Sequence, residues 1–164
     1  MNKEYEFFWR GIYSNWAPSE ITLEGMTFNC VEQYMMYKKA EVAGDTESMQ
    51  AVMDTPMPND QKAIGRKIKN YDDAKWSAVR YEIVKDAVRA KFTQIPDLQE
   101  YLLESGNKHI VEASPYDAVW GIAMGEDDPD RFDESKWRGE NLLGKCIMDV
   151  RDELREAMEA AAGH

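Results

Sequence analysis

The stretch that decides the fold is Asn29-Cys-Val-Glu-Gln-Tyr-Met-Met-Tyr-Lys-Lys-Ala40. Its pattern predicts a helix from Cys30 to about Val42, with Asn29 as the N-cap residue and Gly44-Asp45 at the end. Apolar side chains occupy more than one side of this helix, whereas a surface helix carries a single apolar stripe. We therefore expect the helix to be buried.

Three side chains of this helix share one face, because Glu32, Met36 and Lys39 are spaced at i, i+4 and i+7. A carboxylate and an amine two turns apart can point into one pocket, with a methionine between them. A buried glutamate or lysine requires a charged partner or a chemical role. From the residues alone, a structural Glu–Lys contact, a lysine that extends to solvent and a catalytic pair all remain open.

Outward from this helix, the pattern is helix-rich with a little strand, and it shows neither a repeat nor a linker. We predict a mainly α fold, an α+β arrangement with a few short strands, in a single domain over residues 1–164. Strands are expected at Glu6–Trp9 and His109–Ala113, and loops at Gly11–Ser19 and Ser114–Lys136. Further helices are expected over Gln61–Asn70, along a stripe from Trp76 through Val79 to Phe92, in a short helix capped by Asp97, and along a stripe from Leu143 to Met158.

The charge is strongly acidic but uneven. The 164 residues carry 31 acids and 20 bases, a net charge of −11, which argues against a protein that coats nucleic acid. Residues 62–91 hold nine bases and four acids, whereas Glu126–Glu134 holds six acids in nine residues. We interpret the acidic run as a solvated loop rather than a metal site.

Cysteine and histidine are scarce. Cys30 and Cys146 belong to no CxxC pair, which favours reduced, buried thiols and a cytoplasmic location. With His109 and His164 as the only histidines, a His-rich metal centre is excluded, and we predict neither a metal nor a cofactor. The longest uncharged stretch has nine residues, too short for a membrane span, and the N-terminus does not resemble a signal peptide.

Two other features suggest a binding site. Trp9, Trp16, Trp120 and Trp137 each lie beside turn residues, so they either close the core over loops or form a stacking wall for a flat base. The segment Val111–Gly121 runs from a strand into a Ser-Pro turn, and its Asp117 is either a binding residue or the cap of a short turn.

Taken in order, eight motifs resemble the NADAR (YbiA-like) family from about residue 5 to residue 154, with residues 155–164 as a helix end and tail. They are Phe-Phe-Trp9, Tyr-Ser-Asn-Trp16, Val-Glu-Gln-Tyr-Met-Met-Tyr-Lys-Lys-Ala40, Ile-Gly-Arg66, Glu-Ala-Ser-Pro115, Asp-Ala-Val-Trp-Gly121, Trp-Arg-Gly-Glu-Asn-Leu-Leu-Gly-Lys145 and Met-Asp-Val-Arg151. The resemblance implies a compact, mainly helical fold and N-glycosidase activity on a ribosyl C1′–N bond. It also implies two substrate classes: ribosylamino-pyrimidine phosphates of riboflavin synthesis, and ADP-ribose linked to guanine in nucleic acid.

The resemblance also assigns roles to residues. It places the acidic catalytic position on Glu32 and a Schiff-base lysine on Lys39, and we add Asp117 as a third catalytic candidate. The substrate-binding candidates are Asn15, Trp16, Met36, Trp120, Asn141, Arg10 and Arg138, and the further candidates for holding phosphate are Arg66, Lys67 and Lys145. Ala17, where the family often has an aromatic residue, and Ala123, where glycine is expected, depart from the pattern.

Other functions remain open at this stage. A binding module that recognises ADP-ribose or a nucleotide would keep the tryptophans and arginines but would not need Glu32 and Lys39 on one face. A protein that docks a partner through its Met-rich helix is a third alternative. For the enzyme we expect a small ribosyl phosphate or ADP-ribosyl substrate, and transient contact with ADP-ribosylated nucleic acid stays open. The sequence predicts no membrane partner and does not indicate the oligomeric state or the substrate branch.

Overall fold

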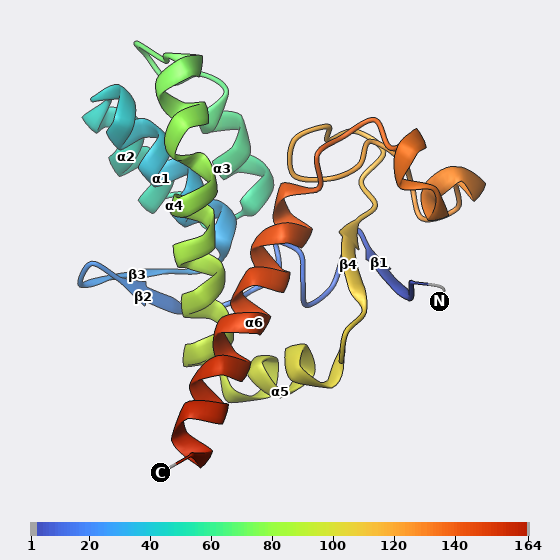
Figure 1. The fold of residues 1–164 in the computed structure, drawn as a ribbon. Coiled ribbons are helices and arrows are strands. Elements are labelled where there is room, and N and C mark those ends of the chain that lie inside the picture. The colour runs from blue at the N-terminus through green and yellow to red at the C-terminus, as the bar shows by residue number, and fades with distance from the viewer. Residues whose placement is uncertain (1–2, 164) are drawn as a thin grey trace. The chain divides into compact units, whose positions relative to one another are not determined.

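The structure is a computed structural model that describes residues 3–163, so His164 lies outside the described part (Figure 1). The chain is mainly helical, as predicted, and it divides into two compact units. The terminal unit combines the described parts of residues 1–14 and 95–164, and the central unit spans residues 15–94. The expected single domain over residues 1–164 stays a prediction, and each unit is described by itself.

The central unit is built around the predicted buried helix. This helix, α1 (Val31–Ala43), packs against α2 (Thr46–Met53), α3 (Pro58–Gly65) and α4 (Asp73–Gln94). An antiparallel hairpin of β2 (Ile21–Leu23) and β3 (Met26–Phe28) precedes it. Because other helices cover α1 on several sides, most residues of its first two turns are buried, and the expectation of a buried helix is confirmed.

The start of α1 differs from the prediction. Asn29 is not the N-cap residue: Cys30 precedes the first helical residue, and the Gln33 side chain accepts a hydrogen bond from the Asn29 N–H at 2.7 Å. The Asn15 carbonyl accepts a second bond, from the Glu32 N–H at 3.0 Å. The Asn15 backbone carbonyl and the Gln33 side chain thus bind the N–H groups at the start of α1, in place of the expected Asn29 cap. The predicted end is confirmed, since Gly44 adopts the left-handed conformation with φ of 74°.

The terminal unit is organised by two parallel strands. β1 (Tyr5–Phe8) pairs with β4 (His109–Glu112), with Tyr5 opposite His109 and Phe8 opposite Glu112. The long helix α6 (Leu142–Ala162) packs against β4, and α5 (Pro96–Glu104) contacts α6. A buried cluster of Val111, Ile122 and Met124 lies next to the sheet. The strands, the short helix and the last helix are therefore where the pattern placed them.

Several local expectations were wrong. The helix expected over Gln61–Asn70 ends at Gly65, and α5 is preceded by Ile95 rather than capped by Asp97. Val79 and Met158, expected in the core, are exposed. Two short 3-10 helices, η1 (Pro129–Phe132) and η2 (Glu134–Lys136), interrupt the long expected loop. The hairpin and α2 were not predicted.

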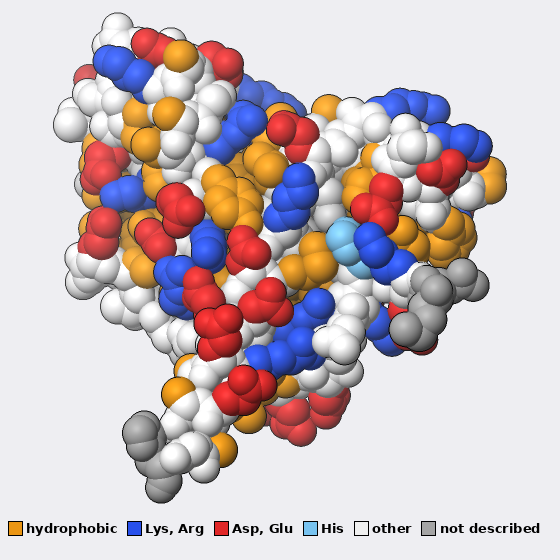
Figure 2. Space-filling model, in the orientation of Figure 1, with side chains coloured by type: hydrophobic (Ala, Val, Ile, Leu, Met, Phe, Trp, Pro, Cys, Tyr) orange, Lys and Arg blue, Asp and Glu red, His pale blue; other side chains and the backbone are white. Residues whose placement is uncertain are grey.

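The surface mixes both signs of charge. Figure 2 shows acidic and basic side chains interspersed on the face drawn there. Lys38, for example, bridges Glu24 and Glu41 on the central unit, and Lys3 pairs with Glu134 on the terminal unit. Among the helices of residues 3–163, none is long and apolar enough to span a bilayer.

Lys91 of α4 is a buried cation, only 1% exposed. Burial lowers the pKa of its amine from 10.5 to about 7, and the nearby Cys30 thiol opposes this shift. Below pH 7 the amine is protonated in both the folded and the unfolded chain, so its burial cost is fully present there. Between pH 7 and 10.5 only the unfolded chain keeps the proton, so the cost declines as the pH rises.

Replacing Lys91 with methionine should therefore remove a pH dependence. Between pH 7 and pH 9, we expect the free energy of unfolding of the natural chain to rise by about 2 kcal/mol relative to that of the Lys91→Met variant. Denaturant titrations of both proteins at several pH values measure this difference. A difference that stays constant over the range would show that Lys91 keeps an ordinary pKa.

Candidate active site

The central unit holds the predicted catalytic pair. Glu32 is buried in the first turn of α1, and Lys39 is half-buried two turns later. The Glu32 carboxylate acts on the pKa of the Lys39 amine, as expected for two charges on one face. Both residues lie in α1, seven residues apart, as the prediction of a shared helix face requires.

The Lys39 amine is fixed by α3 and by the segment that follows it. Its Nζ donates a hydrogen bond to the Gly65 carbonyl at 3.1 Å and lies 4.8 Å from the centre of the Tyr71 ring. Burial lowers the pKa of Lys39, Glu32 and Asp73 oppose this, and the like charge of Arg66 adds to it. The net direction is downward, so this lysine yields the nucleophilic free amine more readily than an exposed lysine does.

Its neighbour Lys38 has the opposite environment. Lys38 Nζ lies 2.6 Å from Glu41 and 3.2 Å from Glu24. Burial lowers the pKa of Lys38, but the two carboxylates outweigh burial and raise the pKa above its ordinary value. Lys38 is therefore held as an ammonium ion, which is a poor nucleophile, and Lys39 is the better candidate on chemical grounds.

Close packing of α3 on α1 sets the position of the Gly65 carbonyl. Met36 is buried between Glu32 and Lys39 along α1, and a Cβ added to Gly65 would collide with its sulfur atom. Glycine at position 65 therefore lets α3 approach α1 closely enough for the carbonyl to reach Lys39. The assignment of Met36 to substrate binding stays a prediction, and its observed contact is with α3.

Substituting Gly65 with alanine should lower both stability and activity. Overpacking of this kind costs about 1–3 kcal/mol, and we expect that loss in the free energy of unfolding, together with a lower kcat as Lys39 loses its support. Chemical denaturation and kinetics measure the two effects. Met36→Ala in the same chain makes room for the new methyl group and should restore part of the stability. Full stability of Gly65→Ala alone would contradict this account of the packing.

The loop before β2 adds two of the predicted residues. Asn15 is buried, and its Oδ1 has no hydrogen-bond partner among residues 3–163, although its backbone carbonyl binds Glu32. Trp16 is 42% exposed, and Lys62 of α3 lies 5.9 Å from the centre of its ring. An indole face and an unused amide oxygen therefore lie on the loop that contacts the N-terminus of α1.

The terminal unit carries the predicted Asp117 and Trp120. Asp117 Oδ1 accepts hydrogen bonds from the backbone of Val119 at 2.9 Å and of Trp120 at 2.8 Å, so one of its oxygens shapes the turn. Trp120 is buried, which is the core-closing arrangement rather than an open wall. Ala123 has φ of 56°, the left-handed region that favours glycine and the physical reason for expecting glycine there. The catalytic role of Asp117 stays a prediction.

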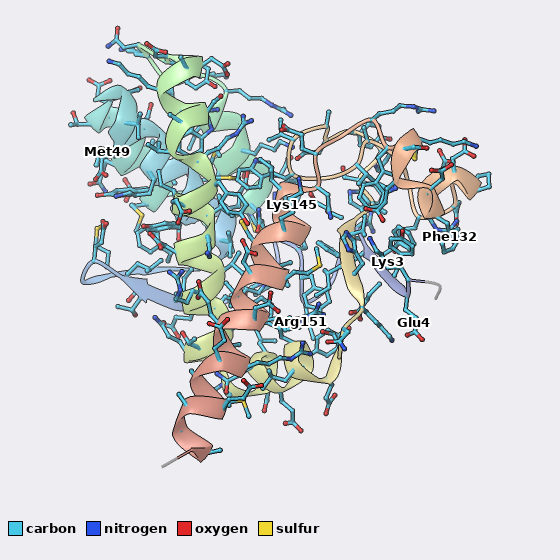
Figure 3. All side chains as sticks on the ribbon, in the orientation of Figure 1. Lys3, Glu4, Met49, Phe132, Lys145 and Arg151 are labelled. Atoms are coloured by element: carbon cyan, nitrogen blue, oxygen red, sulfur yellow. The ribbon has the colours of Figure 1, made fainter. Side chains whose placement is uncertain are left out.

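The remaining candidates in this unit differ in accessibility. Asn141 is fully buried, accepts a hydrogen bond from the Glu112 N–H and donates one to the Ile110 carbonyl, so its amide joins α6 to β4. Arg10 is exposed above the Trp9 ring, and Arg138 is also exposed. Figure 3 shows Lys145 near the start of α6. Their assignment to substrate stays a prediction.

The acidic run Glu126–Glu134 is used largely for local structure. Asp128 accepts from the Asp130 N–H, Asp133 from the Ser135 N–H, and Glu134 from the Tyr5 hydroxyl. Within residues 3–163, no group of three or more His, Cys, Asp or Glu residues is arranged to hold a metal ion.

The NADAR domain matches residues 6–155, which is nearly the whole chain. The chain belongs to the NADAR family. The family assignment predicted from the eight motifs is thus confirmed.

Named relatives of this NADAR chain include several N-glycosidases. It is 40% identical over 150 residues to an N-glycosidase of Acanthamoeba polyphaga mimivirus, covering 88% of each chain. It is 28% identical over 146 residues to a riboflavin biosynthesis protein of Vibrio vulnificus, covering 89% of this chain and 36% of that one. The NMR structure of the E. coli protein YbiA matches with a TM-score of 0.80 at 26% identity, covering 100% of this chain and 91% of that one.

Sequence reasoning missed three parts of the site: Lys62, the Gly65 carbonyl and Tyr71. All three come from α3 or the segment after it, and they reach α1 only through tertiary packing. The Ile-Gly-Arg66 motif was the one signal in the sequence for this region, since glycine permits close approach of the backbone to a neighbouring group.

Proposed function

We propose that this NADAR protein is an N-glycosidase that hydrolyses the C1′–N bond of an anionic ribosylamine or ADP-ribosyl compound. Family membership and the named N-glycosidase relatives support the class of activity. The observation that carries the proposal is the pair formed by Glu32 and Lys39 on α1, in which burial lowers the pKa of the amine beside a buried carboxylate.

Lys39 acts as the nucleophile in this proposal. Opening of the ribose ring breaks the C1′–O4′ bond and leaves a C1′–N iminium. Nζ of Lys39 in its free-amine form adds to C1′, and one of its protons passes to O4′. The bond from C1′ to the departing nitrogen then breaks, and the electron pair of that bond stays with the leaving base. The lysine is left as a protonated imine on C1′, which water attacks to release the sugar and the amine. The net reaction consumes one water molecule.

Glu32 acts as the general acid and base in these steps. As the acid it gives a proton to the departing nitrogen, and as the conjugate base it takes one from the attacking water, so it ends in its starting form. The same carboxylate stabilises the positive charge that develops at C1′. Its place in the first turn of α1, where the Asn15 carbonyl accepts a hydrogen bond from its backbone N–H, puts it on the same face of the helix as Lys39.

Other residues have supporting roles in the proposal. Trp16, with its partly exposed indole, stacks on the base, and the unused Oδ1 of Asn15 accepts a hydrogen bond from substrate. Asp117 orients a water molecule or a ribose hydroxyl through the oxygen that does not cap the turn. Trp120, Asn141, Arg10 and Arg138 remain candidate binding residues.

Incubation with two substrates tests the proposal and separates its branches. The protein is mixed with a ribosylamino-pyrimidine phosphate or with ADP-ribosylated guanosine, and free base is followed by chromatography. Release from either compound supports the enzyme and names its branch. Binding of both compounds without release would instead support the alternative of a non-catalytic ADP-ribose or nucleotide-binding module.

Location and larger partners belong to the same proposal. We place the protein in the cytoplasm, because Cys30 and Cys146 are both buried, free thiols. Contact with ADP-ribosylated nucleic acid would be transient, because a net charge of −11 opposes binding along a phosphate backbone.

A further inference from the structure

Helix α3 places two cations beside the catalytic pair. Lys62 lies in the last turn of α3, and Arg66 follows four residues later with helical backbone angles, so the two side chains share one side of the helix. Lys62 Nζ lies 5.9 Å from the centre of the Trp16 ring. Arg66 is bonded directly to Gly65, whose carbonyl holds Lys39, and its charge lowers the pKa of Lys39. Both cations therefore border groups of the proposed site.

These two cations have no carboxylate partner within 4 Å in the part of the chain that the structure describes. Pairing alone does not set them apart: Lys38 is paired with Glu24 and Glu41, and Lys69 with Glu47, but the amines of the exposed Lys67 and Lys75 also lack a carboxylate partner among residues 3–163. Lys62 and Arg66 differ from these two bases in their position beside Trp16 and Lys39. A favourable interaction with the end of α3 explains one cation near a helix C-terminus, but not two cations beside an exposed indole and the half-buried amine of Lys39.

We propose that Lys62 and Arg66 bind a phosphate group of the substrate and thereby hold the adjoining ribose against Lys39. The inference rests on the proposed function and assigns its phosphate subsite. Arginine offers forked donors and lysine a point charge, a combination that suits a phosphate monoester or a diphosphate. A phosphate there also offsets the charge that Arg66 directs at Lys39, so binding couples the anion to the protonation of the nucleophile.

A pair of substrates isolates this contact from other effects. Kinetics are measured on the ribosylamino-pyrimidine phosphate and on the same compound after removal of its phosphate. We expect Lys62→Gln and Arg66→Gln each to raise KM about tenfold for the phosphorylated compound and to leave the other compound unchanged. The ratio of the two KM values is the readout, because a general disturbance of the fold affects both compounds equally.

Lys75→Gln is the control, since Lys75 is an exposed base of α4 in the same unit and belongs to no part of the candidate site. It should alter neither KM. Equal losses on both compounds in the Lys62 and Arg66 variants, or an equal loss in the Lys75 variant, would overturn the proposed subsite.

A binding measurement separates failure of the subsite from failure of the proposed function. Calorimetry with ribose 5-phosphate and with ribose, on the natural chain and the three variants, requires no turnover. The subsite is supported if the natural chain binds ribose 5-phosphate more tightly than ribose, and if this preference disappears in the Lys62 and Arg66 variants but persists in the control variant. This outcome supports the subsite even where no base is released. A phosphate preference that survives in both variants overturns it even in an active enzyme.

Discussion

Replacing Lys39 with methionine should abolish nearly all turnover while the protein stays folded. Methionine keeps the apolar stem of the side chain and removes the amine that the proposal requires at C1′. We expect kcat to fall roughly 10³-fold or more, as for other enzymes that lose a nucleophile. Release of free base under saturating substrate measures the loss, and circular dichroism with a melting curve checks the fold.

Lys38→Met is the control for this result. Lys38 is adjacent on α1 but is tied to Glu24 and Glu41, which hold it as an ammonium ion. Its replacement should leave kcat within a few-fold of the natural value. Loss of turnover in the Lys38 variant with retention in the Lys39 variant would reverse the assignment of the nucleophile.

Replacing Glu32 with glutamine should cost about 10²–10⁴-fold in kcat, the usual contribution of a general acid–base group. Glutamine has nearly the same shape, so the loss reports the proton and the charge rather than packing. Glu41→Gln, on the same helix, is the matched carboxylate control and should keep its activity. Retained activity in the Glu32 variant would show that another group acts as the acid.

The pH profile of the Glu32 variant supplies a second readout. The Glu32 carboxylate holds up the pKa of the Lys39 amine against burial. Without it, the free amine forms at lower pH, so the rising limb of the residual rate should move to lower pH. A limb that stays in place would show that Lys39 is not the group whose deprotonation starts the reaction.

The catalytic pair could be predicted from sequence because helix geometry is periodic. Glu32 and Lys39 lie seven residues apart within one helix, so their shared face depends only on the helix forming. The partners of Lys39 could not be predicted in this way. Gly65 and Tyr71 reach it from α3 and the following turn, and the contact depends on how closely α3 packs against Met36.

The β2–β3 hairpin and helix α2 were not predicted, because their local sequence signals are weak or ambiguous. The β2–β3 hairpin turns through Glu24 and Gly25, both at positive φ, where Asn-Gly is the usual signal and glutamate is rare. Helix α2 is capped by Asp45, whose carboxylate accepts the Ser48 N–H at 3.1 Å. That Asp-Thr-Glu-Ser pattern is a capping signal, and we interpreted Asp45 only as part of the end of α1.

Two candidate site residues also stabilise the fold. Asn141 joins α6 to β4 through both ends of its amide, and Asp117 caps the turn that leads to Trp120. Sequence patterns mark such residues because asparagine and aspartate are used equally for turns and for ligands. The hydrogen bonds show the structural use of each side chain, and their roles toward a substrate stay predictions.

Borohydride trapping during turnover shows whether Lys39 forms an imine with the sugar. The natural chain is mixed with the substrate that it cleaves, sodium borohydride is added, and peptides are mapped by mass spectrometry. The account predicts a reduced sugar bonded to Nζ of Lys39, absent from Lys39→Met and present in Lys38→Met. Release of base with no adduct at Lys39, or with the adduct on Lys38 or Lys62, would contradict it.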